Sequence, residues 1–112
     1  MVNTSNLHIY LAARKRDEAS QIEDKLVLDG FDVSVFPNAS ALWEAFQQKP
    51  TRFIITDRRF SDNFSGLDLT RRLLARVPSC KAFLVSGDAS PELEAEARAA
   101  GAVDVLPKPC DF

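Results

Sequence analysis

Short apolar runs alternate with longer amphipathic segments along almost the whole chain. The run at residues 53–56 is apolar up to Thr56, as expected of a strand that is covered on both faces. The run at 31–36 alternates apolar and polar residues, which predicts a strand exposed on one face. The five runs that predict strands lie at residues 7–13, 31–36, 53–56, 81–85 and 103–106.

Four segments between these runs repeat apolar residues at helical spacing. Gly30 and Gly101 follow two of these segments, where a helix often ends in a left-handed conformation. Ser90 followed by Pro91 predicts the start of the last helix. The four predicted helices lie at residues 17–29, 39–49, 66–77 and 91–100.

The alternating order predicts one α/β domain over residues 1–112, with a flexible polar tail at 1–6. Strands joined by helical crossovers run parallel, and helices then cover both faces of the sheet. In such a sheet, ligands and reactive groups gather beyond the carboxyl ends of the strands. The residues that follow each predicted strand are therefore the first candidates for a functional site.

Composition and charge narrow the class of protein. The 112 residues include 14 Lys+Arg and 16 Asp+Glu, which gives a net charge of −2. This balance argues against nucleic acid or an anionic membrane as the main partner. No apolar run approaches the roughly 18 residues of a membrane span, and residues 1–6 do not resemble a signal peptide, so we expect a cytoplasmic protein. His8, Cys80 and Cys110 lack metal-ligand spacing and are expected to be a structural histidine and two reduced thiols.

Three chemically useful side chains follow three different predicted strands. Asp57 follows the third strand, Ser86 the fourth and Lys108 the fifth. A carboxylate at the end of a buried strand can act as a nucleophile toward phosphorus, and an ammonium and a hydroxyl can bind the oxygens of the resulting acyl phosphate. The alternative is that Asp57 and Lys108 form a half-buried ion pair that only closes the sheet.

Five short motifs lie at the predicted edges of the strands and helices. They are Ile54-Ile55-Thr56-Asp57, Ser65-Gly66-Leu67, Leu84-Val85-Ser86-Gly87, Ala100-Gly101-Ala102-Val103-Asp104 and Lys108-Pro109. In combination they resemble the receiver domain of two-component response regulators, and the resemblance covers nearly the whole chain. It implies a flavodoxin-like, doubly wound five-stranded sheet in the order 2-1-3-4-5.

The resemblance also implies roles for these residues. Asp57 matches the aspartate that accepts a phosphoryl group from the phosphohistidine of a sensor kinase, with Mg²⁺ as cofactor. Ser86 matches the hydroxyl that bonds to the phosphoryl group, and Lys108 matches the lysine that pairs with its oxygens. The bond between Lys108 and Pro109 is expected to be cis. Such a domain is an acceptor and switch and not an enzyme with turnover, and its partners are a sensor histidine kinase or phosphotransfer protein and an effector domain or protein.

The acidic pair that holds Mg²⁺ in this family is missing at the end of the first predicted strand. Counting back from Asp57 places the pair at Ala12-Ala13, and counting back from Gly30 places it at Ala13-Arg14. Neither count supplies a carboxylate, so Asp57 alone predicts a weak or absent Mg²⁺ site. The nearest acids, Asp17 and Glu18, are expected in the first helical turn, directed toward water.

Basic residues flank Asp57 in this chain. The guanidinium of Arg14 can bind the Asp57 carboxylate and partly take the place of Mg²⁺, or residues 14–16 form a solvated basic loop. Arg58 and Arg59 either steer an anionic donor or are solvated.

Val105 lies three residues before Lys108, at the position where receivers often have an aromatic residue that switches its rotamer together with the hydroxyl residue.

The sequence leaves two hypotheses for the function of the chain. The chain is a receiver that accepts a phosphoryl group on Asp57, or it is a pseudo-receiver that binds partners without phosphorylation. A cofactor-binding enzyme is disfavoured, because residues 12–16 contain no glycine for a phosphate loop.

Receivers carry a fifth helix after the Lys-Pro step, but only residues 110–112 follow it here. We therefore expect either a chain cut inside its domain or a homodimer formed through the face that this helix would cover.

Overall fold

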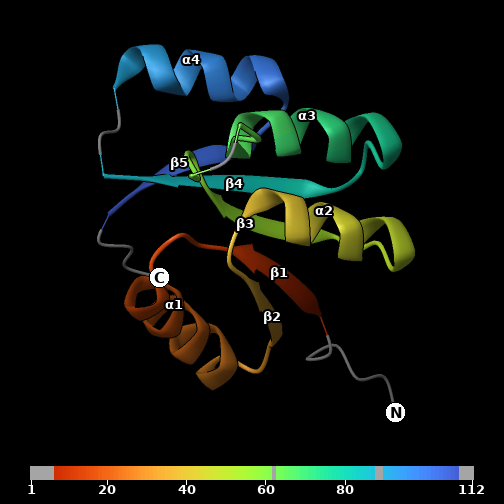
Figure 1. The fold of residues 1–112 in the computed structure, drawn as a ribbon, viewed down its shortest axis with the longest axis vertical. Helices are drawn as coiled ribbons and strands as arrows, with labels where there is room; N and C mark the ends of the chain where they lie inside the picture. The colour runs from red at the N-terminus through yellow and green to blue at the C-terminus, as the bar shows by residue number, and fades with distance from the viewer. Residues whose placement is uncertain (1–6, 62, 88–89, 109–112) are drawn as a thin grey trace.

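Five parallel strands form one sheet in the order β2-β1-β3-β4-β5 (Figure 1). A computed structural model describes residues 7–61, 63–87 and 90–108. The central strands pair in register, with Leu11 opposite Ile55 and Thr56 opposite Leu84. The strands are β1 (His8–Ala12), β2 (Asp32–Phe36), β3 (Phe53–Asp57), β4 (Lys81–Ser86) and β5 (Asp104–Pro107).

Each helix begins or ends at a residue suited to that position. Ser65 caps α3 in a capping box with Asp68, and the Ser90 hydroxyl accepts a hydrogen bond from the amide of Leu93 in α4. Gly30 and Gly101 adopt positive φ angles of 94° and 100° beyond α1 and α4, as the sequence predicts. The helices are α1 (Arg16–Leu28), α2 (Ala39–Gln48), α3 (Gly66–Arg76) and α4 (Pro91–Ala100).

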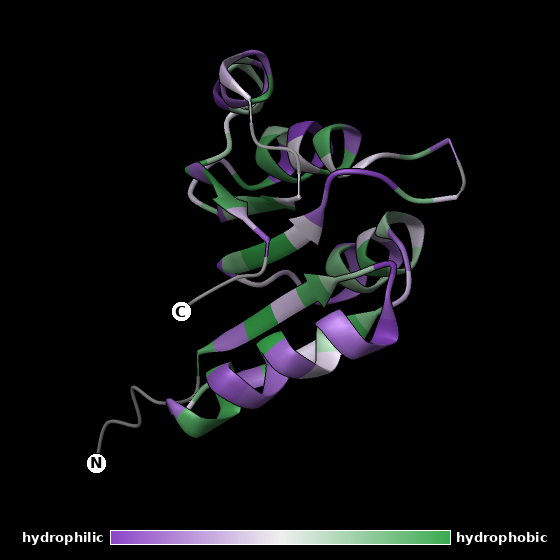
Figure 2. Cartoon of the chain, turned by 90° about the vertical axis from the view of Figure 1, so that its left-hand side faces the viewer, coloured by the Kyte–Doolittle hydropathy of each residue, from purple (hydrophilic) through white to green (hydrophobic). Residues whose placement is uncertain are grey.

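The helices cover the two faces of the sheet unequally. Figure 1 shows α2, α3 and α4 on one side of the sheet and α1 on the other. The first side holds the largest core cluster, with Phe46, Leu69 and Leu73 completely buried. On the other side, Ile22 and Leu26 of α1 pack against the odd-numbered residues of β1 and β3. The outward side of α1 is mostly polar, and the apolar residues Val27 and Leu28 are exposed at its C-terminal end (Figure 2).

The predicted fold is confirmed, with one local difference at β2. The alternating pattern predicts one exposed face, but apolar Val35 is 39% exposed while polar Ser34 is partly buried. The reason is that β2 is an edge strand, and Ser34 is a partner for the Nε2 atom of His8 on β1 at 2.6 Å. This hydrogen bond confirms the structural role predicted for His8.

The face that carries α1 has an apolar groove of about 330 Å³ beside that helix. The groove is lined only by apolar residues: Leu7, Ile9, Leu26, Phe31, Phe53, Ile55, Phe83 and Leu106.

None of the helices in the described residues is both long and apolar enough to cross a membrane. The predictions for the tail at 1–6, for the cis bond to Pro109 and for Cys110 lie outside the described residues.

Candidate functional site

Asp57 is the last residue of β3 and lies buried at the carboxyl edge of the sheet, with 5% of its surface exposed. The backbone around it is closely packed against the start of α3. A Cβ atom at Gly66 would lie 2.0 Å from the carbonyl oxygen of Asp57, so only glycine fits there. The amide of Gly66 also donates to the carbonyl of Arg58 at 2.9 Å. These contacts fix the turn that presents the Asp57 carboxylate.

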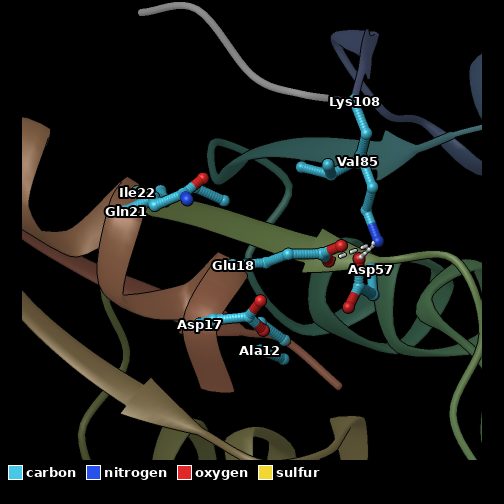
Figure 3. A pocket seen from close by; sticks show the side chains of 9 residues that line it. Ala12, Asp17, Glu18, Gln21, Ile22, Asp57, Val85 and Lys108 are labelled. Carbon is cyan, nitrogen blue, oxygen red and sulfur yellow. Dashed lines mark ion pairs between the residues drawn. The ribbon is translucent and has the colours of Figure 1, made fainter. Parts of the chain in front are cut away.

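Lys108 binds two carboxylates from different elements. Its Nζ atom lies 2.8 Å from Oδ1 of Asp57 and 2.8 Å from Oε1 of Glu18, in the first turn of α1. Figure 3 shows both carboxylates directed toward this nitrogen. The Oε1 atom of Glu18 is buried and forms an ion pair with Lys108. Asp57 and Glu18 are therefore joined through one ammonium group.

The ion pairs change the acidity of Lys108. Burial alone lowers the pKa of this ammonium, because a charged group loses hydration. The contacts with Asp57 and Glu18 favour the charged form and outweigh burial, so the pKa of Lys108 is raised above 10.5. Lys108 is therefore a fixed cation at neutral pH.

The end of β1 lies beside Asp57 but offers no side-chain ligand to it. Ala12 pairs with Thr56, and both Ala12 and Ala13 are buried, at 0% and 6% exposure. The backbone amide of Arg14 donates to Oδ2 of Asp57 at 2.7 Å. Among the described residues, the cation paired with Asp57 is Lys108, and of the two alternatives for Arg14 the structure shows a contact with Asp57 through the backbone amide and not through the guanidinium. Arg14 itself is exposed.

Ser86 and Val105 lie on the next two strands. Ser86 ends β4 and is buried, and its carbonyl oxygen accepts a hydrogen bond from the amide of Lys108 at 3.0 Å. This bond places the start of the Lys108 side chain beside the edge of β4. Val105 is buried in β5 against a cluster that includes Leu84 and Leu93. The structure thus brings Asp57, Ser86 and Lys108 to one edge, as their positions after three strands predict.

The prediction that the side chain of Glu18 is directed toward water is wrong. Glu18 lies in the first turn of α1, as expected, but its carboxylate contacts Lys108 and does not point to water. The sequence holds a signal for this direction, because Glu18 precedes buried Ile22 by four residues and so shares its side of the helix. Ile22 and Glu18 line the same cleft (Figure 3).

A cleft of about 380 Å³, which we call the Asp57 cleft, opens beside these groups. It lies between the first turns of α1 and the carboxyl ends of β1, β3 and β4, with Lys108 on its far side. This is the edge at which parallel α/β sheets place their sites. It is lined by Ala12, Ala13, Asp17, Glu18, Gln21, Ile22, Asp57, Val85 and Lys108.

A five-stranded parallel sheet in the order 2-1-3-4-5, with an aspartate, a serine and a lysine at its carboxyl edge, defines a receiver-type signalling domain. The sequence profile of the response regulator receiver domain matches residues 15–112. The chain belongs to the response regulator receiver domain family.

Individual relatives agree with this family. The transcriptional regulatory protein FixJ of Bradyrhizobium diazoefficiens is 30% identical over 110 residues, which cover 95% of this chain and 51% of FixJ. The chain therefore spans about half the length of that relative. The chemotaxis protein CheY4 of Vibrio cholerae has a similar fold, with a TM-score of 0.86 at 17% identity over 95% of this chain and 89% of CheY4. The receiver domain of Francisella response regulator 1452 matches with a TM-score of 0.85 at 21% identity, over 95% and 87% of the two chains.

Receiver domains generally use Mg²⁺ at the phosphorylation site, but the side chains described here do not fit that ion. Mg²⁺ binds through carboxylate oxygens, but the residues beside Asp57 on β1 are Ala12 and Ala13. The other carboxylates of the Asp57 cleft are those of Asp17 and Glu18 on α1, and Glu18 is paired with Lys108. Both oxygens of Asp57 already contact Lys108 and the amide of Arg14. Among the described residues, no group of three or more His, Cys, Asp or Glu side chains could hold a metal ion.

Proposed function

We propose that this receiver domain acts in two-component signalling as a protein-interaction module that works without phosphoryl transfer to Asp57. The observation that supports this proposal is the pair of buried alanines, Ala12 and Ala13, beside the Asp57 carboxylate. Phosphoryl transfer needs cations that neutralise the phosphoryl oxygens and hold them in line with the nucleophile. Lys108 supplies one such cation, but it is shared with Glu18.

Such a module would be regulated by what binds near the carboxyl edge and not by a covalent modification. Its proposed partners are a sensor histidine kinase or phosphotransfer protein on the input side and an effector domain or protein on the output side. Support for these partners comes from membership of the receiver family.

The second candidate function is that Asp57 accepts a phosphoryl group. It is favoured by the distance of 2.8 Å between Asp57 and Lys108 and by Ser86, which lines an adjoining cleft with both of them. In this case an oxygen of Asp57 would form the new bond to phosphorus as the bond to the donor breaks. Lys108 would bind the phosphoryl oxygens, and the Ser86 hydroxyl would bond to one of them.

Labelling with a small acyl phosphate donor distinguishes the two candidates. The wild-type chain, Asp57→Asn and Ala13→Asp are incubated with acetyl phosphate, with and without Mg²⁺, and labelling is read by intact mass. Ala13 is chosen because it belongs to both pairs that the sequence places at the metal site. We expect no labelling of the wild type and Mg²⁺-dependent labelling of Ala13→Asp.

Strong Mg²⁺-dependent labelling of the wild type that is lost in Asp57→Asn would refute the proposal and establish the second candidate. Because Ala13 is buried, circular dichroism must show that Ala13→Asp folds. Arg14→Asp, at an exposed position, is the second variant expected to gain labelling.

A further inference from the structure

Cationic residues from two distant segments gather on one side of Asp57. Arg14 and Lys15 precede α1, whereas Arg58 and Arg59 follow β3. Pairing of β1 with β3 brings the two segments together, and the hydrogen bond from the Arg14 amide to Asp57 joins them. With Lys108, these residues line an open cleft of about 510 Å³, which we call the cationic cleft.

The charge of the cationic cleft is opposite to that of the whole chain. Five cationic side chains line it against two carboxylates, those of Glu18 and Asp57, which leaves an excess of three positive charges. The chain as a whole carries a net charge of −2. The positive charge is therefore concentrated at this place, and a concave surface lined by one sign of charge attracts ions of the opposite sign.

The neighbouring Asp57 cleft differs in charge, although the two clefts share Glu18, Asp57 and Lys108. Its remaining charged residue is Asp17, so carboxylates outnumber cations there. An anion is consequently directed to the side of Asp57 that carries the arginines. Guanidinium groups offer several N–H donors in a plane that matches the oxygens of phosphate.

We propose that the cationic cleft binds a phosphate-bearing small molecule non-covalently and without a divalent cation. The proposal rests on the proposed function, in which the cleft works without phosphoryl transfer. The ligand's phosphate contacts Lys108 in place of Glu18, and Arg14 and Arg58 bind its remaining oxygens. Release of Glu18 gives up its ion pair with Lys108, and the contact between Lys108 and the phosphate replaces it.

Titration of the 112-residue chain tests this inference. Inorganic phosphate and phenyl phosphate are added in EDTA at low ionic strength, and binding is followed by amide chemical shifts and calorimetry. We expect saturable binding of one ligand per chain, weakened by salt, with the largest shifts at residues 14–18 and 57–59.

The variants separate a built site from general attraction. Arg14→Gln and Arg58→Gln should each weaken phosphate binding about twofold to fivefold, which is the range for one exposed charge. Glu18→Gln should strengthen binding by a similar factor, because a competing anion is removed from Lys108. Arg52→Gln is the matched control, since Arg52 is exposed at the opposite, amino end of β3.

Two results would overturn the inference: no saturable binding in EDTA, or binding that Arg14→Gln, Arg58→Gln and Arg52→Gln reduce equally. Failure of phosphate to bind, with the wild type still unlabelled by acetyl phosphate, would refute the ligand and leave the proposed function standing. Mg²⁺-dependent labelling of Asp57 would instead refute the proposed function on which the ligand depends.

Discussion

The ammonium nitrogen of Lys108 lies 2.8 Å from Oδ1 of Asp57, although Asp57 ends β3, Lys108 follows β5, and β4 lies between these two strands. The same nitrogen contacts Glu18 of α1. Lys108 thus connects the last described strand, the middle of the sheet and the helix on the less covered face. Loss of this one cation should affect the fold as well as the site.

Replacement of Lys108 by methionine should destabilise the chain by about 1–3 kcal/mol, because it leaves the buried Asp57 carboxylate without its cation. Asp57→Asn should cost less, since Lys108 keeps Glu18 as a partner. Urea unfolding of both variants and of the double variant measures the coupling. A Lys108→Met chain as stable as the wild type would show that the ion pair contributes nothing.

The stability of the chain should fall between pH 9 and pH 11 because of Cys80. Burial raises the pKa of this thiol from 9.0 to about 11, so the folded chain holds the proton to a higher pH than the unfolded chain does. The protonated thiol makes its full contribution to the free energy of unfolding below pH 9. As the pH rises to 11, the free energy of unfolding falls by about 2 kcal/mol.

The Cys80→Ala variant isolates this effect of pH. Lys108 and Tyr10 also have raised pKa values, but they remain in both chains, so their contributions cancel in the difference. Denaturant unfolding at pH 8, 9, 10 and 11 should show the wild type losing stability faster than Cys80→Ala. Parallel curves would contradict the burial of the thiol.

Gly66→Ala should destabilise the chain by about 1–3 kcal/mol, because the new methyl group would overlap the carbonyl oxygen of Asp57. Gly87→Ala is the matched control, since a Cβ atom there meets nothing closer than 4.0 Å. Its effect should stay within about 0.5 kcal/mol. Thermal unfolding of the two variants compares them directly, and equal melting temperatures would contradict the close packing of α3 against Asp57.

The apolar groove beside α1 leads us to predict self-association. Two copies related by a two-fold axis would present the same apolar surface to each other. Sedimentation velocity should show a dimer fraction that rises with concentration and is reduced by Leu106→Lys, on the groove. Val103→Lys is the control, because Val103 is an apolar residue of the same region, 43% exposed, that does not line the groove. A wild type that stays monomeric at high concentration would refute the homodimer.

The order and type of the elements could be predicted from the sequence because local patterns determine them. Each of these patterns acts within a few residues of the element that it defines. Examples are the apolar run before Asp57, the Ser90-Pro91 start of α4 and the positive-φ glycines at 30 and 101. The convergence of Asp57, Ser86 and Lys108 could also be predicted, because parallel strands end at one edge.

The contacts of charged side chains could not be predicted in the same way. Glu18 contacts Lys108, 90 positions away in the chain, because the ammonium is within reach of the first turn of α1. Arg14 meets Asp57 through its backbone amide, and no residue pattern encodes the choice between a backbone and a side-chain donor. Such contacts depend on how the loops at the edge of the sheet are placed relative to one another.

Titration of the chain with Mg²⁺ determines whether the site at Asp57 holds this ion. Amide chemical shifts of Arg14, Asp57 and Lys108 are followed in the wild type and in Ala13→Asp. We expect no saturable shift of these amides in the wild type at Mg²⁺ concentrations that saturate Ala13→Asp. Saturable binding in the wild type, centred on Asp57 and as tight as in the variant, would contradict this expectation.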